Sequence, residues 1–216
     1  MKITQRSFTT RLVVSVTLIF FSLLMLQITL QYIPAGRELA FLRIKQEALL
    51  KPFYFESFYT HVYSSMFALL AGFTQFSVQI RRDYKKLHRA MGYIYVLVVL
   101  VFSGPTGIYM GVYANGGWSS QLAFVLLAIL WWLFTFLAMK SAWQGDFQSH
   151  QKWMIRSYAL TLSAITLRLW KWGIVAVFEP RPMDVYRWVA WLGWVINLLV
   201  AEGFIKRMNS VRSLPL

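Results

Sequence analysis

Cysteine is absent from this 216-residue sequence, and acidic residues are scarce. Without thiols the chain cannot form disulfides, ligate an iron–sulfur cluster through thiolates, hold a thioether-linked haem or use a thiol nucleophile. Only 8 aspartates and glutamates stand against 22 lysines and arginines, which gives a formal net charge of +14. The basic residues flank apolar runs and form no continuous stripe, so the pattern indicates positive loops beside a lipid bilayer and no nucleic-acid partner.

Long apolar runs dominate the remainder, because 58% of the residues are apolar and only 14% are charged. A membrane helix needs about 20 mostly apolar residues, so six helices use roughly 120 to 140 residues and leave only short connections. The sequence therefore predicts an all-α integral membrane protein that forms one six-helix domain over residues 1–216. The expected spans cover about residues 12–32, 58–80, 88–113, 120–139, 153–178 and 186–205.

Basic clusters alternate with these spans and predict the orientation. Arg81 to Lys86, Lys140 to Lys152 and the tail from Lys206 are rich in cations, so we expect them, and both chain ends, to be cytoplasmic. The first span follows a basic amino-terminal segment, but its apolar run is longer than that of a signal peptide and no cleavage site follows, so a retained helix is expected. The connection 34–54 is predicted to be external and to contain a short surface helix.

The sequence has three histidines, His61, His88 and His150, and each lies at the mouth of a predicted span. At 100° per residue, each heads the small and polar face of its helix. Such faces turn toward other helices, because polar groups are poorly tolerated against lipid. The three side chains are therefore predicted to point inward. The faces comprise Ala68, Gly72, Gln75 and Gln79 after His61; Gly92, Tyr95, Thr106 and Tyr113 after His88; and Ser157, Thr161, Ala164 and Arg168 after His150.

His88 and His150 suggest a haem site. If spans two to five form an up-down four-helix bundle, spans three and five lie on a diagonal of roughly 12 to 14 Å. That gap suits a haem b whose iron is bound by both imidazoles, with Arg89, Lys152 and Arg156 near its propionates. A second bis-histidine haem is excluded by the histidine count.

Two other interpretations of these histidines remain open. They can be neutral interface residues within basic loops that only set topology. They can also form a metal site with Asp83 and Asp146, although the many nearby cations oppose a divalent ion.

His61 and Arg168 are candidate catalytic residues near the opposite, external half. His61 suits proton transfer or a hydrogen bond to a quinone, and it also suits a buried polar contact. Arg168 lies roughly 15 Å deep by helical rise, where a cation needs a partner or a cavity. The partners considered are Glu179, Asp184, Glu202, Asn197, a lipid phosphate and an anionic or quinone substrate.

Several motifs resemble a known family. The segments His88-Arg89-Ala90-Met91-Gly92-Tyr93-Ile94-Tyr95, Trp153-Met154-Ile155-Arg156-Ser157-Tyr158-Ala159-Leu160-Thr161 and Thr166-Leu167-Arg168 resemble the bacterial membrane family catalogued as domain of unknown function 2306. The resemblance covers about residues 59–170, and it implies a bacterial inner-membrane location without naming an activity. The arrangement is also similar in architecture to the six-helix ascorbate-type b cytochromes, whose central helices carry haem ligands in diagonal pairs. Span four has no histidine here, which departs from that pattern.

Two functions follow as hypotheses. The first is a b-type cytochrome-like inner-membrane protein with one haem, acting as a haem-dependent oxidoreductase in electron transfer with a quinone or a redox partner protein. The second is a non-redox binding, transport or assembly subunit in which Arg168 and the histidines surround a polar intramembrane cavity.

Overall fold

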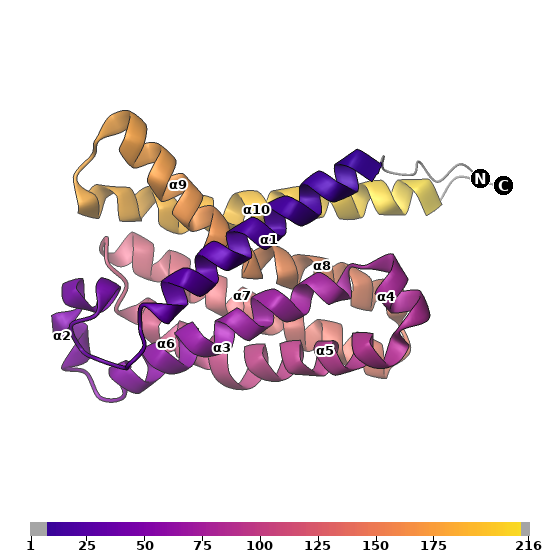
Figure 1. The fold of residues 1–216 in the computed structure, drawn as a ribbon, viewed down its shortest axis with the longest axis horizontal. Coiled ribbons are helices and arrows are strands. Elements are labelled where there is room, and N and C mark those ends of the chain that lie inside the picture. Colours follow the sequence, from indigo (N-terminus) through magenta and orange to yellow (C-terminus); the bar gives the residue numbers. More distant parts are fainter. Residues whose placement is uncertain (1–7, 213–216) are drawn as a thin grey trace.

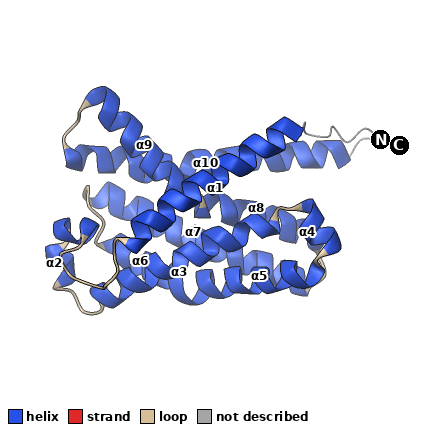
Figure 2. Ribbon diagram, viewed as in Figure 1, coloured by secondary structure: helices blue, strands red, loops and turns tan. Residues whose placement is uncertain are grey.

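The computed structural model describes residues 8–212, and this part is helical without any strand (Figures 1 and 2). The basic amino-terminal residues 1–7 and the last four residues of the basic tail lie outside the described part. The elements are α1 (Phe8–Leu30), the 3₁₀ helix η1 (Ala40–Ile44), α2 (Gln46–Leu49), α3 (Tyr54–Gln75), α4 (Val78–Asp83), α5 (Lys85–Leu97), the π-helical η2 (Val98–Ser103), α6 (Gly104–Val112), α7 (Trp118–Trp143), α8 (Phe147–Thr161), α9 (Ser163–Phe178) and α10 (Pro182–Arg212).

Four helical stretches are long and apolar enough to cross a membrane. They are Lys85–Val112, Trp118–Trp143, Phe147–Phe178 and Asp184–Ser210. The first two expected spans are also helical, as α1 and α3, although α1 contributes only a shorter apolar stretch and α3 is more polar. The all-helical membrane fold is thus confirmed, whereas six spans with both ends inside stay a prediction.

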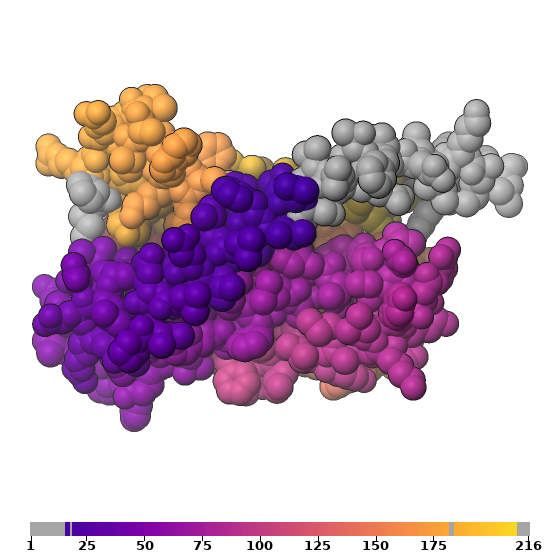
Figure 3. Space-filling model, in the orientation of Figure 1, coloured from indigo at the N-terminus to yellow at the C-terminus, as the bar shows by residue number. Residues whose placement is uncertain are grey.

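A bundle of α3, the α5–η2–α6 helix, α7 and α8 forms the centre of the molecule. The α5–η2–α6 helix packs on α3 and α7, and α8 packs mainly on α7 and α10, so α5 and α8 face each other across the bundle. Helix α1 lies obliquely over α3 (Figure 3). The start of α1 and the end of α10 lie at the same end of the molecule as α4 (Figure 1). We call this end, which carries the connections α4 and α7–α8, the basic end.

A π-helical turn directly precedes Gly104-Pro105. In a π-helix the backbone N–H bonds to the carbonyl five residues earlier, and Pro105 has no N–H to give Leu100. The Leu100 carbonyl accepts instead from Trp132 Nε1 on α7, at 3.0 Å. A neighbouring helix therefore satisfies the freed carbonyl, as a membrane helix with a proline requires.

The fifth predicted span corresponds to one apolar stretch of sequence, but the structure divides it into two helices, α8 and α9. It begins at Asp146, whose side chain caps α8 by accepting from the Ser149 N–H at 3.0 Å. It turns at Leu162, after which α9 leaves the bundle and pairs with the first half of α10 (Figure 1). Thr166 fixes that pair by donating to the Gly193 carbonyl at 2.5 Å. This divergence leaves space between α9 and the bundle.

The segment between α1 and α3 covers the end of the bundle opposite the basic end. Tyr59 accepts from the Gly36 N–H at 2.7 Å, and Tyr63 donates to the Tyr32 carbonyl at 2.7 Å, so tyrosines of α3 hold the segment in place. It contains η1 and α2, as the sequence predicted for a short surface helix. We call residues 34–53 the cap segment.

Candidate functional site

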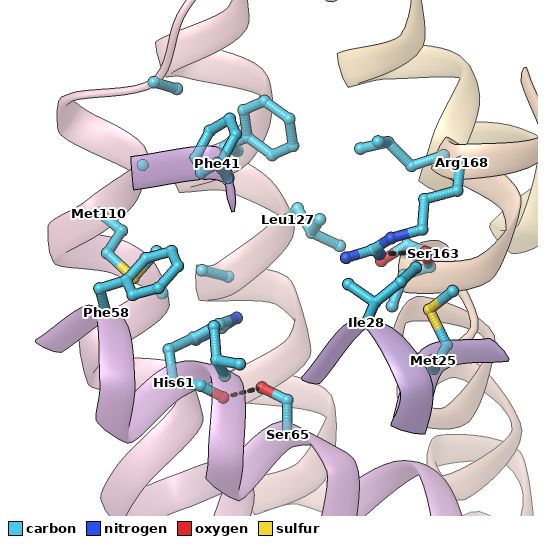
Figure 4. A pocket seen from close by; sticks show the side chains of 18 of the residues that line it. Met25, Ile28, Phe41, Phe58, His61, Ser65, Met110, Leu127, Ser163 and Arg168 are labelled. Atoms are coloured by element: carbon cyan, nitrogen blue, oxygen red, sulfur yellow. Dashed lines mark hydrogen bonds between the residues drawn. The ribbon is translucent and has the colours of Figure 1, made fainter. Parts of the chain in front are cut away.

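A cavity of about 490 Å³ lies beneath the cap segment, between α1, α3, α6, α7 and the turn from α8 to α9 (Figure 4). Its wall is mostly apolar, with Met25, Phe58 and Leu127 among the contributors. A few polar side chains interrupt that wall. Volume, apolar lining and few polar groups are all typical of small-molecule sites.

Arg168 enters the cavity from α9, with its guanidinium directed toward the side where His61 lies (Figure 4). Part of the side chain borders the cavity, and the residue as a whole is exposed. Its Nη1 donates a hydrogen bond to the Ala164 carbonyl at 2.6 Å, one turn earlier on its own helix.

The carboxylates and the amide expected near Arg168 lie elsewhere. Glu179 and Asp184 are exposed, and within residues 8–212 neither forms an ion pair with this arginine. Glu202 pairs with Arg156, and Asn197 donates to the Ala159 carbonyl and to Thr166. A membrane-embedded cation needs either a partner or a cavity, and Arg168 borders a cavity.

His61 faces the same cavity from α3 with one ring nitrogen engaged. Its Nδ1 lies 2.9 Å from the Ser103 carbonyl, so Nδ1 carries the proton and donates. The other nitrogen, Nε2, is then the acceptor of the neutral ring. His61 therefore presents an acceptor, and Arg168 presents donors, to one shared space.

Two lysines add positive charge to the wall. Lys171 approaches Tyr186, with Nζ 3.4 Å from the hydroxyl and 5.0 Å from the ring centre. Lys45, in the cap segment, is only 4% exposed and donates to the Tyr113 carbonyl. Burial lowers the pKa of Lys45 to about 8. No aspartate or glutamate borders the cavity in the described part of the chain, so its field is positive.

His88 and His150 lie at the basic end and point into the bundle. Tyr95 and Ser157 follow them by seven residues, or two turns on the same helix faces, and these two side chains meet at 2.7 Å across the bundle. The histidines occupy the equivalent positions two turns nearer the basic end. The sequence predicted that both imidazoles point inward, and in the structure both are partly buried among the helices.

The hydrogen bonds of these rings differ. His150 Nδ1 lies 2.8 Å from the Ala138 carbonyl, to which it donates, so Nε2 is left with a free lone pair. His88 Nδ1 is buried and has no hydrogen-bond partner among the described residues. An imidazole that is oriented by a backbone carbonyl and a second imidazole without a hydrogen-bond partner could both serve as ligands of a metal ion or a haem iron.

The three expected propionate partners are placed unequally. Arg89 is exposed near His88, and Lys152 is partly buried on α8. Arg156 already has partners within the protein. It forms two hydrogen bonds of 2.5 and 2.9 Å to Glu202, and its guanidinium carbon lies 4.6 Å from the Trp153 ring centre.

The alternative metal site lacks its carboxylates. Asp83 is paired with Arg82 at 2.7 Å, and Asp146 caps α8, where hydrogen bonds from Ser149 hold its pKa below the ordinary value. Among residues 8–212 no group of three or more histidines and carboxylates could hold an ion.

Sequence reasoning missed Lys45 and the inner residues of α7. Lys45 was assigned to an external polar connection, and nothing in its neighbourhood signalled burial except apolar residues at helical spacing, Leu42 and Leu49. Thr135 and Trp131 lie in a sequence of almost entirely apolar residues, so the sequence shows no polar face on α7.

Comparisons with known proteins identify a family and nothing further. The family DUF2306, described as "Predicted membrane protein", matches residues 58–205, which extends the resemblance seen in the sequence into α10. No curated protein and no solved structure matches the chain. Since the match covers more than half of the sequence, this protein belongs to the DUF2306 family of predicted membrane proteins.

Proposed function

We propose that this protein binds an amphiphile within the membrane, in the cavity that contains Arg168. The observation that carries the proposal is a mostly apolar cavity with Arg168, Lys171 and Lys45 on its wall and no carboxylate among its described lining residues. Cations at membrane depth are costly without an anionic or polar partner. A ligand with an acidic or carbonyl oxygen at its head and an apolar body supplies that partner and fills the remaining wall.

His61 narrows the head-group chemistry. With Nδ1 held by the Ser103 carbonyl, Nε2 accepts a hydrogen bond and so favours a ligand that also carries a hydroxyl. Quinols and hydroxylated or protonated acids share this combination of one donor and one acceptor. The role is that of the non-redox binding or transport protein, and a quinone ligand would add redox chemistry to it.

Arg168→Leu tests the proposal, with a short-tailed quinone and a dansyl-labelled long-chain carboxylate as probes in detergent. Loss of a charge-assisted hydrogen bond is worth about 1.5 to 3 kcal/mol, so we expect at least about tenfold weaker binding of whichever probe fits. Arg187→Leu, an exposed arginine of α10 outside the cavity wall, is the matched control and should bind as the wild type does. If neither probe binds, or binding ignores Arg168, the proposal fails.

A haem between His88 and His150 is the second candidate function. It is supported by the free Nε2 of His150 and the buried, unpartnered Nδ1 of His88. The two imidazoles would hold the iron, and Arg89 and Lys152 would face the propionates. A bound haem would supply one-electron chemistry. It would have to lie toward the basic end, because Tyr95 and Ser157 close the bundle two turns deeper.

The absorption spectrum of the purified protein tests whether a haem is bound. Protein purified from haem-sufficient cells should show a Soret band that shifts on dithionite reduction and is lost in His88→Ala and in His150→Ala. His61→Ala, at the other end, should keep the band. A colourless wild-type preparation excludes the haem, and a band that survives both substitutions excludes these ligands.

A further inference from the structure

Two cations of α9 border the cavity side by side. Arg168 and Lys171 are three residues apart in one helix, and side chains at this spacing are neighbours on the helix surface. Arg168 uses one N–H on the Ala164 carbonyl, but a guanidinium has five N–H donors. Lys171 has three donors and approaches the Tyr186 hydroxyl at 3.4 Å. Both side chains therefore keep donors for a further acceptor in the cavity.

The third cation, Lys45, reaches the same end of the cavity from the cap segment. It donates to the Tyr113 carbonyl, where the short connection from α6 to α7 begins. That connection passes directly beside Tyr186, because a Cβ on Gly116 would lie 2.9 Å from the Tyr186 Cβ. It thus contacts Lys45 at its start and the neighbour of Lys171 three residues later. The three cations surround one end of the cavity, which we call the cationic end.

The connection also brings an unpartnered donor to the cationic end. The Asn115 amide nitrogen is buried and has no hydrogen-bond partner among the described residues, and Asn115 borders the cavity. Buried polar groups in folded proteins nearly always have a partner. An amide without one, beside three cations, indicates that a bound molecule supplies acceptor oxygens here.

The carboxylates of the protein do not neutralise the cationic end. All 8 aspartates and glutamates lie within residues 8–212, and none of them borders the cavity. All are exposed except Glu202, which pairs with Arg156. The cationic end therefore carries up to three positive charges, and its lysines and arginine donate hydrogen bonds without accepting any.

We propose that the cavity binds a lipid whose head group is a phosphate monoester. This inference rests on the proposed function and names the class of its ligand. A phosphate monoester carries up to two negative charges on three acceptor oxygens. A carboxylate carries one charge and a quinone carries none, so each leaves most of the positive charge unmatched. Among these heads, the phosphate monoester neutralises the cationic end best.

The phosphate monoester also suits His61. Its Nδ1 donates to the Ser103 carbonyl, so Nε2 accepts a hydrogen bond. A phosphate monoester loses its second proton only at about pH 6, and in the singly ionised form it has both a hydroxyl that donates and anionic oxygens that accept. An ionised carboxylate has no proton to donate. One phosphate head therefore offers both kinds of partner that the cavity presents.

The apolar part of the wall accommodates the lipid chain. Met25 of α1, with Met66 and Leu69 of α3, forms an apolar cluster that borders the cavity farther from the cap segment. The head then lies beneath the cap segment, and the chain extends toward the middle of the bundle. A lipid of the adjacent leaflet has this orientation, with its head at the surface and its chain at the membrane centre.

Calorimetric titration of the purified protein in neutral detergent tests the head-group class. The probes are a long-chain alkyl phosphate and the alkyl sulfate with the same chain. Their heads have the same tetrahedral shape, but the sulfate carries one charge and no hydroxyl. The wild type should bind the alkyl phosphate at least about tenfold more tightly, because a further charge-assisted hydrogen bond contributes about that much. Inorganic phosphate should bind far more weakly, because it has no chain to bury.

Two substitutions test the cationic end itself. Lys171→Met removes one charge, and Asn115→Asp adds a negative charge with almost no change of shape. Each should reduce the preference for the alkyl phosphate over the alkyl sulfate at least about threefold, because the doubly charged head depends more strongly on the local field. Lys51→Met is the matched control, since Lys51 is an exposed lysine of the cap segment that does not border the cavity. It should keep the wild-type preference.

The possible results separate this inference from the proposed function. If the alkyl sulfate binds as tightly as the alkyl phosphate, or if neither substitution changes the preference, the phosphate assignment is overturned. Amphiphile binding then still stands, provided that the dansyl-labelled carboxylate binds and depends on Arg168. Inorganic phosphate that binds as tightly as the alkyl phosphate would overturn the assignment to a lipid. If none of the amphiphiles binds, the proposed function fails as well.

Discussion

Lys45 shows how one residue connects the cap segment to the cavity. Its ammonium is buried against Phe41, 5.7 Å from the ring centre, and donates to the Tyr113 carbonyl beyond the end of α6. Burial penalises the charged form, which is why its pKa falls to about 8. A lysine in this position is charged at neutral pH but loses its proton within an accessible range.

Binding of an anionic probe should therefore depend on pH through Lys45. Below pH 8 the ammonium is charged and attracts the anion, whereas above pH 8 it is neutral. We expect the affinity for the dansyl-labelled carboxylate to be constant from about pH 6 to 7 and to fall roughly three- to tenfold by about pH 9.5, the size of a partly screened ion pair. Fluorescence titration at each pH measures this.

Lys45→Arg provides the control, because a guanidinium stays charged throughout this range. Its affinity should be flat with pH. A wild-type affinity that also stays flat to pH 9.5 would show that Lys45 does not contact the head group.

For single residues, the sequence predicted inward orientation where small and polar side chains recur with helical periodicity. It did not predict burial where that periodicity is absent. Most members of the polar faces led by His61, His88 and His150 turn inward, because a regular helix carries its period directly into space. Gln79 does not, since α3 ends at Gln75 and Gln79 is exposed on α4. Lys45 could not be assigned, since its burial depends on a cap segment that folds back onto α3. Thr135 could not be assigned either, since one hydroxyl among apolar neighbours carries no periodic signal.

Close helix contacts at glycine determine the geometry of the bundle. A Cβ on Gly72 of α3 would lie 1.9 Å from Cε2 of Tyr158, so the ring of α8 occupies the place of a side chain. The Tyr158 hydroxyl then reaches the Leu69 carbonyl one turn away. On the small face that the sequence showed on span two, Gly72 is thus the point against which Tyr158 of α8 packs.

Gly72→Ala should therefore destabilise the protein. The new methyl group forces Tyr158 to move, and overpacking of this kind costs about 1 to 3 kcal/mol. Unfolding in a mixed-micelle detergent titration, followed by tryptophan fluorescence, should shift to lower denaturant. Gly203→Ala in α10, where a Cβ would meet nothing within 4 Å, should leave the midpoint unchanged or raise it slightly. Equal midpoints for the two variants would contradict the packing.

The element boundaries that the sequence could not predict are those decided by tertiary contacts. The π turn before Pro105 depends on Trp132 of α7 to satisfy Leu100, and the turn at Leu162 depends on α9 finding α10 through Thr166 and Gly193. A hydropathy profile shows both helices as uninterrupted apolar runs, because it depends on composition and contains no information about contacts with neighbouring helices. The cavity arises from the second of these breaks, so its residues could be named from the sequence but its position could not.

Charge distribution governs the molecule as a whole. Exposed cations of α4, of the start of α5 and of the last turn of α7 lie at one end, together with the start of α1 and the end of α10 (Figure 1). They are Arg81, Arg82, Lys85, Lys86 and Lys140. The cap segment lies at the other end. Under the positive-inside rule the basic end is cytoplasmic and the cap segment is external, provided that α1 and α3 both cross the bilayer.

Single cysteines can test that arrangement, because the natural sequence has none. Lys51 of the cap segment and Gln148 at the start of α8 are both exposed. With six spans, Lys51→Cys should react with a membrane-impermeant maleimide in intact cells, and Gln148→Cys should react only after permeabilisation. If only the four most apolar helices cross, residue 51 lies on the same side as residue 148, and the two variants label alike. Labelling of Gln148→Cys alone would instead mean that the whole molecule is inverted, which would place the positive cavity in the cytoplasmic half and make its ligand a component of the inner leaflet.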